Sequence, residues 1–208
     1  MRKSQDSVWH HVQAAAVPIS ALTAWQALFD HAHLAAGQSV LIHGAAGGVG
    51  VFAVQLAHWA GAHVIATASA RNRDFLHELG ANEVIDYTTT HFEDGVHEVD
   101  LVFDTVGGDT LQRSWQVIKP GGVLVTIVSP PPSFENAQAH GICPFWFVVE
   151  PNRDELIQIG TLIDAGHLRP IIDTVFPLAQ ARQAYEQGSA AVVRIRNNYR
   201  STLLSQVA

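Results

Sequence analysis

The sequence predicts an α/β fold, a doubly wound parallel sheet followed by a C-terminal segment. Three observations lead to this prediction. Short apolar runs, typical of strands buried on both faces of a sheet, alternate with stretches of helical periodicity. The first clear run, residues 40–43, leads directly into the glycine-rich stretch 44–50 and then into a helical pattern. The chain has 208 residues, 48% of them hydrophobic, which is sufficient for a large core without disulfides.

The predicted elements follow one another in a regular order. The predicted strands are 40–43, 63–67, 83–86, 100–106 and 123–128, with 145–149 as a candidate sixth strand. The predicted helices are 20–34, 49–59, 71–79, 110–118, 155–165 and 178–187. Residues 1–13 and the proline-rich stretch 129–144 are expected to be irregular, 171–176 is an apolar stretch, and 192–195 is a candidate strand.

Composition narrows the range of partners and locations. A formal net charge of −7 and a pI of about 5.9 argue against a nucleic acid or an anionic membrane as partner. The apolar stretch near the N-terminus is interrupted by Pro18 and polar residues, and it is shorter than the roughly 20 residues that a span needs. The single cysteine, Cys143, permits neither an internal disulfide nor a multi-cysteine zinc site. We therefore expect a cytoplasmic protein with neither kind of partner.

The stretch Gly44 to Gly50 has the features of a dinucleotide-binding turn. Gly44, Gly47 and Gly50 fit the pattern G-x-x-G-x-x-G, whereas in G-x-G-x-x-G the first glycine is replaced by Ala45. Small residues permit a tight turn and a close approach of backbone to pyrophosphate, and the following helix start favours the negative charge. A glycine-rich turn that binds no ligand could have the same sequence pattern. The strand before it and the helix after it favour a Rossmann-type site for a nicotinamide cofactor.

The residues after the second predicted strand favour NADP(H) over NAD(H). NAD-selective domains place a carboxylate there, about 20 residues after the glycine turn, to hold the ribose diol. Here the chain reads 67–73 TASARNR, and the first carboxylate is Asp74. Small hydroxyl side chains leave room for a 2′-phosphate, and Arg71 or Arg73 could neutralise it. Arg73 is the better candidate for an arginine that is merely solvated.

Further motifs carry a resemblance to a known family. In chain order they are 14–18 AAAVP, 22–25 LTAW, 80–87 GANEVIDY, 104–108 DTVGG, 119–122 KPGG, 166–170 GHLRP and 176–178 FPL. Together with the glycine turn they resemble the zinc-independent, quinone oxidoreductase-like, NADP-dependent branch of the medium-chain dehydrogenase/reductases. The resemblance covers residues 13–188. It implies a leader at 1–16, a dinucleotide-binding Rossmann domain at 17–150, and a C-terminal helix with a remnant of the catalytic domain at 151–208.

The resemblance also implies roles for individual residues around the cofactor. It places Thr23, Ile127, Ser129 and Phe147 near the nicotinamide ribose and ring. The pyrophosphate would face Gly47, Gly48 and Val49, and Val106 would border the adenine. The adenosine 2′-phosphate would lie among Thr67, Ser69, Arg71 and Tyr87. For Tyr87, simple packing at a strand end is the alternative, and Asp104 is expected to be structural rather than catalytic.

Two departures from the family pattern affect the functional prediction. Zinc-dependent relatives carry a cysteine ligand near the position of Ile19, and the paired histidines of this chain lack a suitable spacing, so no metal is expected. The β-rich N-terminal domain of the family has no counterpart before residue 13. Residues 170–208 would normally pack against that domain, and we predict that they are poorly anchored here.

Two functions remain open at this stage. The first is an NADPH-dependent, zinc-independent oxidoreductase that transfers hydride to a small-molecule quinone, enone or other activated carbonyl; the sequence assigns no catalytic acid. The second is a truncated, inactive family member that still binds nucleotide and acts by pairing, with Phe145–Val149 as a candidate homodimer strand. The Tyr-x-x-x-Lys of short-chain dehydrogenases and the Gly-Lys-Ser/Thr of P-loop proteins are both missing. A methyltransferase fits the topology, but usually has an acidic residue ending the second strand.

Overall fold

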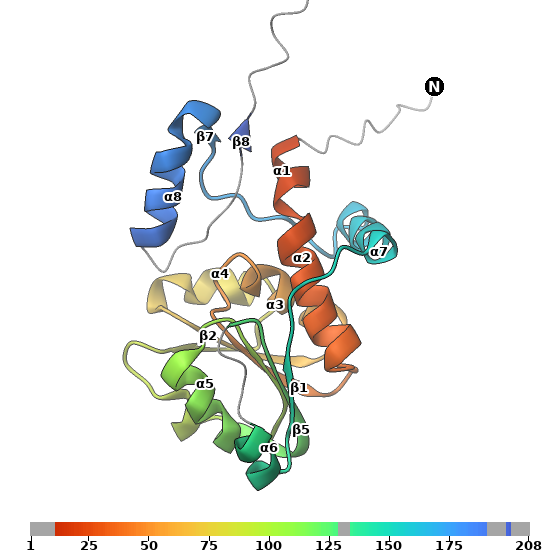
Figure 1. Cartoon of the computed structure of the whole chain (residues 1–208), viewed down its shortest axis with the longest axis vertical. Helices are drawn as coiled ribbons and strands as arrows, with labels where there is room; N and C mark the ends of the chain where they lie inside the picture. The colour runs from red at the N-terminus through yellow and green to blue at the C-terminus, as the bar shows by residue number, and fades with distance from the viewer. Residues whose placement is uncertain (1–10, 129–133, 191–198, 201–208) are drawn as a thin grey trace, which may run out of the picture.

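The computed structural model describes residues 11–128, 134–190 and 199–200, and its centre is a six-stranded parallel sheet (Figure 1). The strands lie in the order β3-β2-β1-β4-β5-β6, the order of a doubly wound Rossmann sheet. Their bounds are β1 Ser39–His43, β2 His63–Ala68, β3 Glu83–Asp86, β4 Val99–Asp104, β5 Ile118–Thr126 and β6 Cys143–Trp146. The predicted fold class is therefore confirmed.

Helices cover both faces of the sheet and enclose two hydrophobic clusters. One face packs against α2 Pro18–Trp25, η1 Gln26–His31, α3 Gly50–Trp59, α4 Arg73–Glu78 and α7 Arg153–Asp164. The other packs against η3 Phe92–Asp94, α5 Gly108–Ser114, η4 Trp115–Val117 and α6 Phe134–His140 (Figure 1). Side chains alternate along a strand, so Val40 and Ile42 enter the first cluster and Leu41 enters the second.

The C-terminal elements lie outside these layers. After α7 the chain continues through β7 Phe176–Pro177, η5 Leu178–Gln180 and α8 Ala181–Ala190, which Figure 1 shows to one side of the sheet. β7 pairs in parallel with β8 Tyr199–Arg200. The candidate strand 192–195 lies outside the described residues. In the part of the chain that the structure describes, no helix has the length and apolar character needed to cross a membrane.

Two predictions around the sixth strand were wrong. The stretch 129–144 is not wholly irregular, because it contains α6, which buries Ala137 and ends before Gly141 at φ 64°. The sixth strand is β6, 143–146, instead of 145–149. It begins one residue before Pro144, which lacks a backbone N–H and is tolerated because β6 forms an edge of the sheet.

The N-terminal region also differs from the prediction. His11 to Gln13 are not irregular but belong to helix α1 His11–Ala16. The predicted helix 20–34 is α2 followed by the π-helix η1, and it ends at His31. The strand predicted at 123–128 starts earlier, at Ile118, and continues through the Pro120-Gly121-Gly122 stretch, with a register shift opposite Val99 and Leu101.

The side chain of Gln26, the first residue of the π-helix, links the segment before β1 to the segment after β6. Its amide nitrogen donates to the backbone oxygen of Glu150 and to Oε2 of Glu155, both at 2.8 Å. Its amide oxygen accepts from the backbone nitrogen of Glu150 at 3.0 Å. The first turn of α7 is capped by Asn152, whose Oδ1 accepts from the backbone nitrogens of Asp154 and Glu155 at 3.0 and 3.2 Å. These contacts fix α7 on the sheet.

Candidate nucleotide site

The glycine turn after β1 has a backbone that only small residues can form. Gly44 has φ 69°, and a Cβ atom there would lie 2.4 Å from Oγ1 of Thr105. At Gly50, the first residue of α3, a Cβ would lie 2.3 Å from the backbone oxygen of Gly44. The nitrogen of Gly47 donates to that same oxygen at 2.9 Å. The turn is therefore closed tightly, as the glycine pattern predicts.

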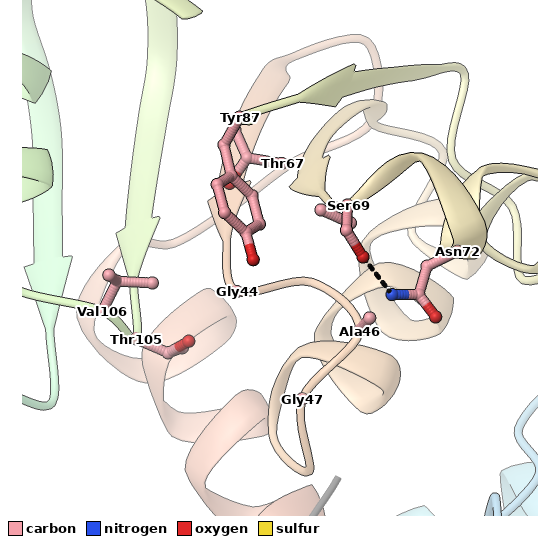
Figure 2. Close-up of a pocket in the computed structure, with 10 residues that line it drawn as sticks. Gly44, Ala46, Gly47, Thr67, Ser69, Asn72, Tyr87, Thr105 and Val106 are labelled. Atoms are coloured by element: carbon pink, nitrogen blue, oxygen red, sulfur yellow. Dashed lines mark hydrogen bonds between the residues drawn. The ribbon is translucent and has the colours of Figure 1, made fainter. Parts of the chain in front are cut away.

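A pocket of about 260 Å³ opens beside this turn, at the carboxyl ends of β1, β2 and β4. The order of the sheet reverses between β1 and β4, which is where ligands bind in doubly wound folds. Five predicted residues meet in its lining (Figure 2): Gly47, Thr67, Ser69, Tyr87 and Val106. Gly44 and Ala46 also line it and belong to the predicted glycine turn, whereas the prediction missed Ala68, Asn72 and Thr105. All ten lining residues are uncharged.

Four of the ten lining residues carry a hydroxyl group: Thr67, Ser69, Tyr87 and Thr105. The hydroxyl of Ser69 accepts a hydrogen bond of 3.0 Å from Nδ2 of Asn72, which lies in the 3-10 turn η2 Ala70–Asn72 (Figure 2). Thr105 follows β4 directly, so its place could have been read from the strand end. Asn72 could have been found only from its spacing of three residues after Ser69, a turn geometry that polar side chains favour.

Tyr87 enters the pocket from the end of β3, and half of its surface is exposed. The turn that follows it is held by Asp86, whose Oδ1 accepts from the hydroxyl of Thr88 at 2.7 Å and from its backbone nitrogen at 3.0 Å. The hydroxyl of Thr88 and then its backbone nitrogen hold the pKa of Asp86 below its usual range, although burial opposes them. Asp86 thus stays ionised and keeps the chain around Tyr87 in place.

Asp104, at the end of β4, has a structural part in the site. Its carboxylate is fully buried and accepts from the backbone nitrogens of Val106 and Gly107 and from the hydroxyl of Thr126, at 2.9 to 3.1 Å. These bonds shape the turn that carries Thr105 and Val106 into the pocket. Gly107 adopts φ 77° there, and a Cβ would lie 2.7 Å from Val128.

Those of the remaining predicted site residues that the structure describes do not line the pocket. Arg71 is exposed on η2. Gly48 and Val49 lie in the turn itself, where Val49 precedes α3 without a side-chain cap. Thr23 is buried and donates to the backbone oxygen of Ile19 at 2.7 Å. Two further residues pack against the first cluster, Ile127 and Phe147, the latter with its ring 4.5 Å from that of His31. Ser129 lies outside the described residues.

The described residues do not fit a metal ion. Nowhere in residues 11–128, 134–190 or 199–200 do three or more His, Cys, Asp or Glu side chains gather closely enough to hold one. Cys143 is exposed on the edge strand β6. Since a structural or catalytic zinc needs at least three protein ligands, no step is assigned to zinc.

The fold and the glycine turn define a dinucleotide-binding protein of the Rossmann class. Within that class, a sequence model described as zinc-binding dehydrogenase matches residues 79–193. The chain belongs to this family, which is part of the medium-chain dehydrogenase/reductase superfamily. The resemblance to the medium-chain dehydrogenase/reductases is therefore confirmed.

Individual relatives agree with this assignment. A mitochondrial zinc-binding oxidoreductase of Arthroderma benhamiae is 34% identical over 93% of this chain and 62% of its own length. The 2-methylene-furan-3-one reductase of Solanum lycopersicum is 36% identical over 80% of this chain and 40% of its own length. The structure of the quinone oxidoreductase from Coxiella burnetii superposes with a TM-score of 0.80 at 38% identity, covering 87% of this chain and 58% of that chain. The chain thus spans less than two thirds of these relatives.

Proposed function

We propose that this chain binds NADP(H) and serves an oxidoreductase that transfers hydride, without zinc, between the nicotinamide and a quinone, an enone or another activated carbonyl. The observation that carries the proposal is the closed glycine turn beside an uncharged pocket at the switch point of the sheet. Nicotinamide cofactors supply the hydride in such reactions, and the protein binds and orients them.

The turn itself would hold the pyrophosphate. Gly47, Gly48 and Val49 lead into α3, whose backbone nitrogens at Val51, Phe52 and Ala53 already donate to the backbone oxygens of Gly47 and Val49. The pyrophosphate would therefore face the backbone of the turn itself, where the dipole of α3 favours its negative charge. A side chain at Gly47 would already crowd the oxygen of Gly44, at 3.1 Å, and would obstruct the phosphates.

The adenosine end would lie between β2 and β4. Val106 would border the adenine, with Thr67, Ser69 and Tyr87 around the ribose and its 2′-phosphate. No carboxylate lines the pocket to repel that phosphate. Arg71, exposed on the adjacent turn η2, is long enough to approach it from solvent. We expect NADPH to bind more tightly than NADH for these reasons.

The nicotinamide end would lie toward Thr23, Ile127, Ser129 and Phe147. The relatives favour activated carbonyls as substrates, since they include a quinone oxidoreductase and a 2-methylene-furan-3-one reductase. A further structure similar to this chain is the enoyl reductase CurK, with a TM-score of 0.75 at 29% identity. Some relatives are named as mitochondrial, so a cytoplasmic location remains only a prediction.

Pairing of two copies is a second part of the proposal. β6 is an edge of the sheet and exposes Phe145 and Trp146 by 38% and 43%. An apolar edge strand is a template for another strand. We infer a homodimer that joins the sheets at β6, to be tested by sedimentation of the wild type and of Phe145→Lys.

Titration calorimetry with NADPH and NADH tests the cofactor proposal. The variant Gly50→Ala places a methyl group against the backbone of Gly44 and Ala45, which cannot move aside. Overpacking of this kind costs about 1–3 kcal/mol of stability. Opening the turn relieves the strain but displaces the backbone that would face the pyrophosphate, so we expect NADPH affinity to fall by about tenfold or more. Gly160→Ala is the matched control, because nothing lies within 4 Å of its added methyl. Equal affinity in both variants, or tighter binding of NADH by the wild type, would contradict the proposal.

A separate assay tests catalysis. NADPH oxidation is followed with a panel of quinones and enones, using the same protein preparation that binds the cofactor. Saturable binding without turnover would support the alternative, an inactive nucleotide-binding member of the family.

A further inference from the structure

Some hydroxyl groups around the pocket already donate their protons to atoms of the protein itself. A threonine or serine hydroxyl has one proton to donate and two lone pairs with which to accept. Once its proton is donated to a protein atom, the hydroxyl can offer a ligand only an acceptor. The three hydroxyls at Thr67, Ser69 and Thr105 differ in this respect, and the difference originates in His43, the last residue of β1.

The ring of His43 is fully buried and bonds at both nitrogens. Nε2 lies 3.1 Å from the hydroxyl of Ser114, and Nδ1 lies 3.0 Å from the hydroxyl of Thr67. Ser114 donates its only proton to the backbone oxygen of Thr110 at 2.7 Å. The hydroxyl of Ser114 therefore accepts, and Nε2 of His43 must be the nitrogen that carries the proton.

It follows that Nδ1 of His43 accepts and that Thr67 donates to it. Burial lowers the pKa of His43 from 6.5 to about 4, against the attraction of Asp104, so the ring is neutral and holds a single proton at pH 7. Thr105 donates its proton to the backbone oxygen of the same histidine at 2.8 Å. One residue thus takes the hydroxyl protons of both threonines, whereas Ser69 accepts from Asn72 and does not use its own proton in that bond.

We propose that His43 is a positioning residue that makes the Thr67 hydroxyl an obligate acceptor, so that this point of the pocket recognises a hydrogen-bond donor of the adenosine moiety and Ser69 is the hydroxyl that faces the phosphate. The donor is a ribose hydroxyl or the adenine amino group. This inference rests on the proposed function, because it assumes a nicotinamide dinucleotide in the pocket.

In this assignment Thr67 accepts the hydrogen bond that a carboxylate accepts in NAD-selective domains. There, an acidic residue at the end of the second strand accepts from the ribose diol. Thr67 lies in the same part of β2 and accepts without carrying a charge. A neutral acceptor does not repel a neighbouring 2′-phosphate. The pocket can therefore hold the ribose and still admit the phosphorylated cofactor.

The tautomer is measured first, on the wild-type protein without any variant. Long-range ¹⁵N–¹H correlation spectra of the histidine side chains distinguish a protonated Nε2 from a protonated Nδ1. We expect His43 to be protonated at Nε2 at pH 7, and Thr67→Val to shift its Nδ1 resonance. A protonated Nδ1 in the wild type would overturn the inference regardless of any binding result.

Binding is then measured with NADH and three analogues, which contain 2′-deoxyadenosine, 3′-deoxyadenosine, or hypoxanthine in place of adenine. Loss of one neutral hydrogen bond should weaken NADH binding to Thr67→Val by about three- to tenfold. For the analogue that lacks the donor, the same substitution should change the affinity by less than about twofold. The analogue with this behaviour identifies the donor. Thr67→Ser keeps the hydroxyl and is expected to restore binding.

Ser114→Ala tests the action of His43 from outside the pocket, since it leaves both threonine hydroxyls in place. Removing the acceptor for Nε2 favours protonation of Nδ1, and Thr67 then has to accept from His43 and donates toward the ligand instead. We expect the tautomer signal to switch and NADH affinity to fall by about three- to tenfold, as in Thr67→Val. Ser114→Thr, which keeps the hydroxyl, is the matched control.

The outcomes separate this inference from the proposed function. If the wild type binds neither NADH nor NADPH, the proposed function is overturned, and the ligand assignment made here is overturned with it. If the wild type binds both but Thr67→Val weakens NADH and all three analogues equally, only the assignment of Thr67 is overturned. An unchanged tautomer in Ser114→Ala would overturn the role of His43.

Discussion

The sheet and the C-terminal arm, defined here as residues 171–190, differ in how far their apolar side chains are exposed. In the sheet, Leu41, Phe103 and Leu124 are almost completely buried. In the arm, Leu178 and Tyr185 are exposed by 50% and 73%. An isolated helix shorter than about 12–15 residues is marginal in water, and α8 has 10. The comparison teaches that the nucleotide site depends on the sheet, whose elements are fixed by packing, and that the arm contributes little to its stability.

Truncating a core side chain in each region is the strongest test of this comparison. Leu41→Ala removes a fully buried side chain from the second cluster and should lower the free energy of unfolding by about 2–5 kcal/mol. Leu178→Ala, the matched change in the arm, should alter it by no more than about 0.5 kcal/mol. Urea unfolding followed by tryptophan fluorescence measures both. A similar loss in the two variants would mean that the arm packs as firmly as the sheet.

The pH dependence of stability should likewise arise in the sheet. Burial keeps the pKa of His43 at about 4, and the charges of Asp104, Arg113 and Glu93 adjust it. The unfolded chain takes up this proton near pH 6.5 and the native protein only near pH 4. The contribution of neutral His43 is therefore complete above pH 6.5 and is lost as the pH falls toward 4, by about 3 kcal/mol in total.

Urea titrations of wild type and His43→Gln between pH 4 and pH 7.5 isolate this contribution. Glutamine does not titrate, so the difference between the two proteins should grow with pH and level off near pH 7. The arm variant Leu178→Ala, which changes no titratable group, supplies the control and is expected to follow the wild-type slope. Parallel curves for wild type and His43→Gln would contradict the assignment.

A smaller effect should show where the boundary between the two regions falls. Asn152 caps α7, and α7 buries Ile159 completely against the sheet. Asn152→Ala should cost about 1 kcal/mol of global stability, whereas Asn152→Ser should keep most of the cap. If the alanine variant only melts α7 locally and leaves the unfolding midpoint unchanged, α7 belongs with the arm and not with the sheet.

Sequence patterns predicted the sheet well because its signals are local. A continuous apolar run such as 40–43 and the glycines after it determine both the strand and the turn, and the structure places them as expected. The failures arose where a local signal was ambiguous. α6 has only seven residues and follows a run of prolines, so its short pattern does not distinguish a helix from a loop. Pro144 in β6 had the same effect, since proline is tolerated only at an edge that the sequence does not reveal.

The site was predicted less completely than the fold. The family resemblance predicted Thr67 and Tyr87, and the structure brings them together because parallel strands place their carboxyl ends at one edge of the sheet. Whether the Thr67 hydroxyl donates or accepts could not be predicted from the sequence. It depends on Ser114, which is 71 positions from His43 and approaches it only through packing. Arg71 was predicted near the 2′-phosphate because of its charge. Its exposed position on η2 depends on the direction in which its side chain leaves that turn, which the sequence does not determine.

The bonds of Gln26 to Glu150 and Glu155 have a consequence for how this unit can be reused. They close a loop of more than a hundred residues, so the chain enters and leaves the sheet at a single place. A module with neighbouring ends can be spliced into a surface loop of another protein without pulling its host apart. The unit that could be transferred in this way includes α2 and α7, which flank the Gln26 contacts in the chain, lie in contact with each other and complete the first cluster.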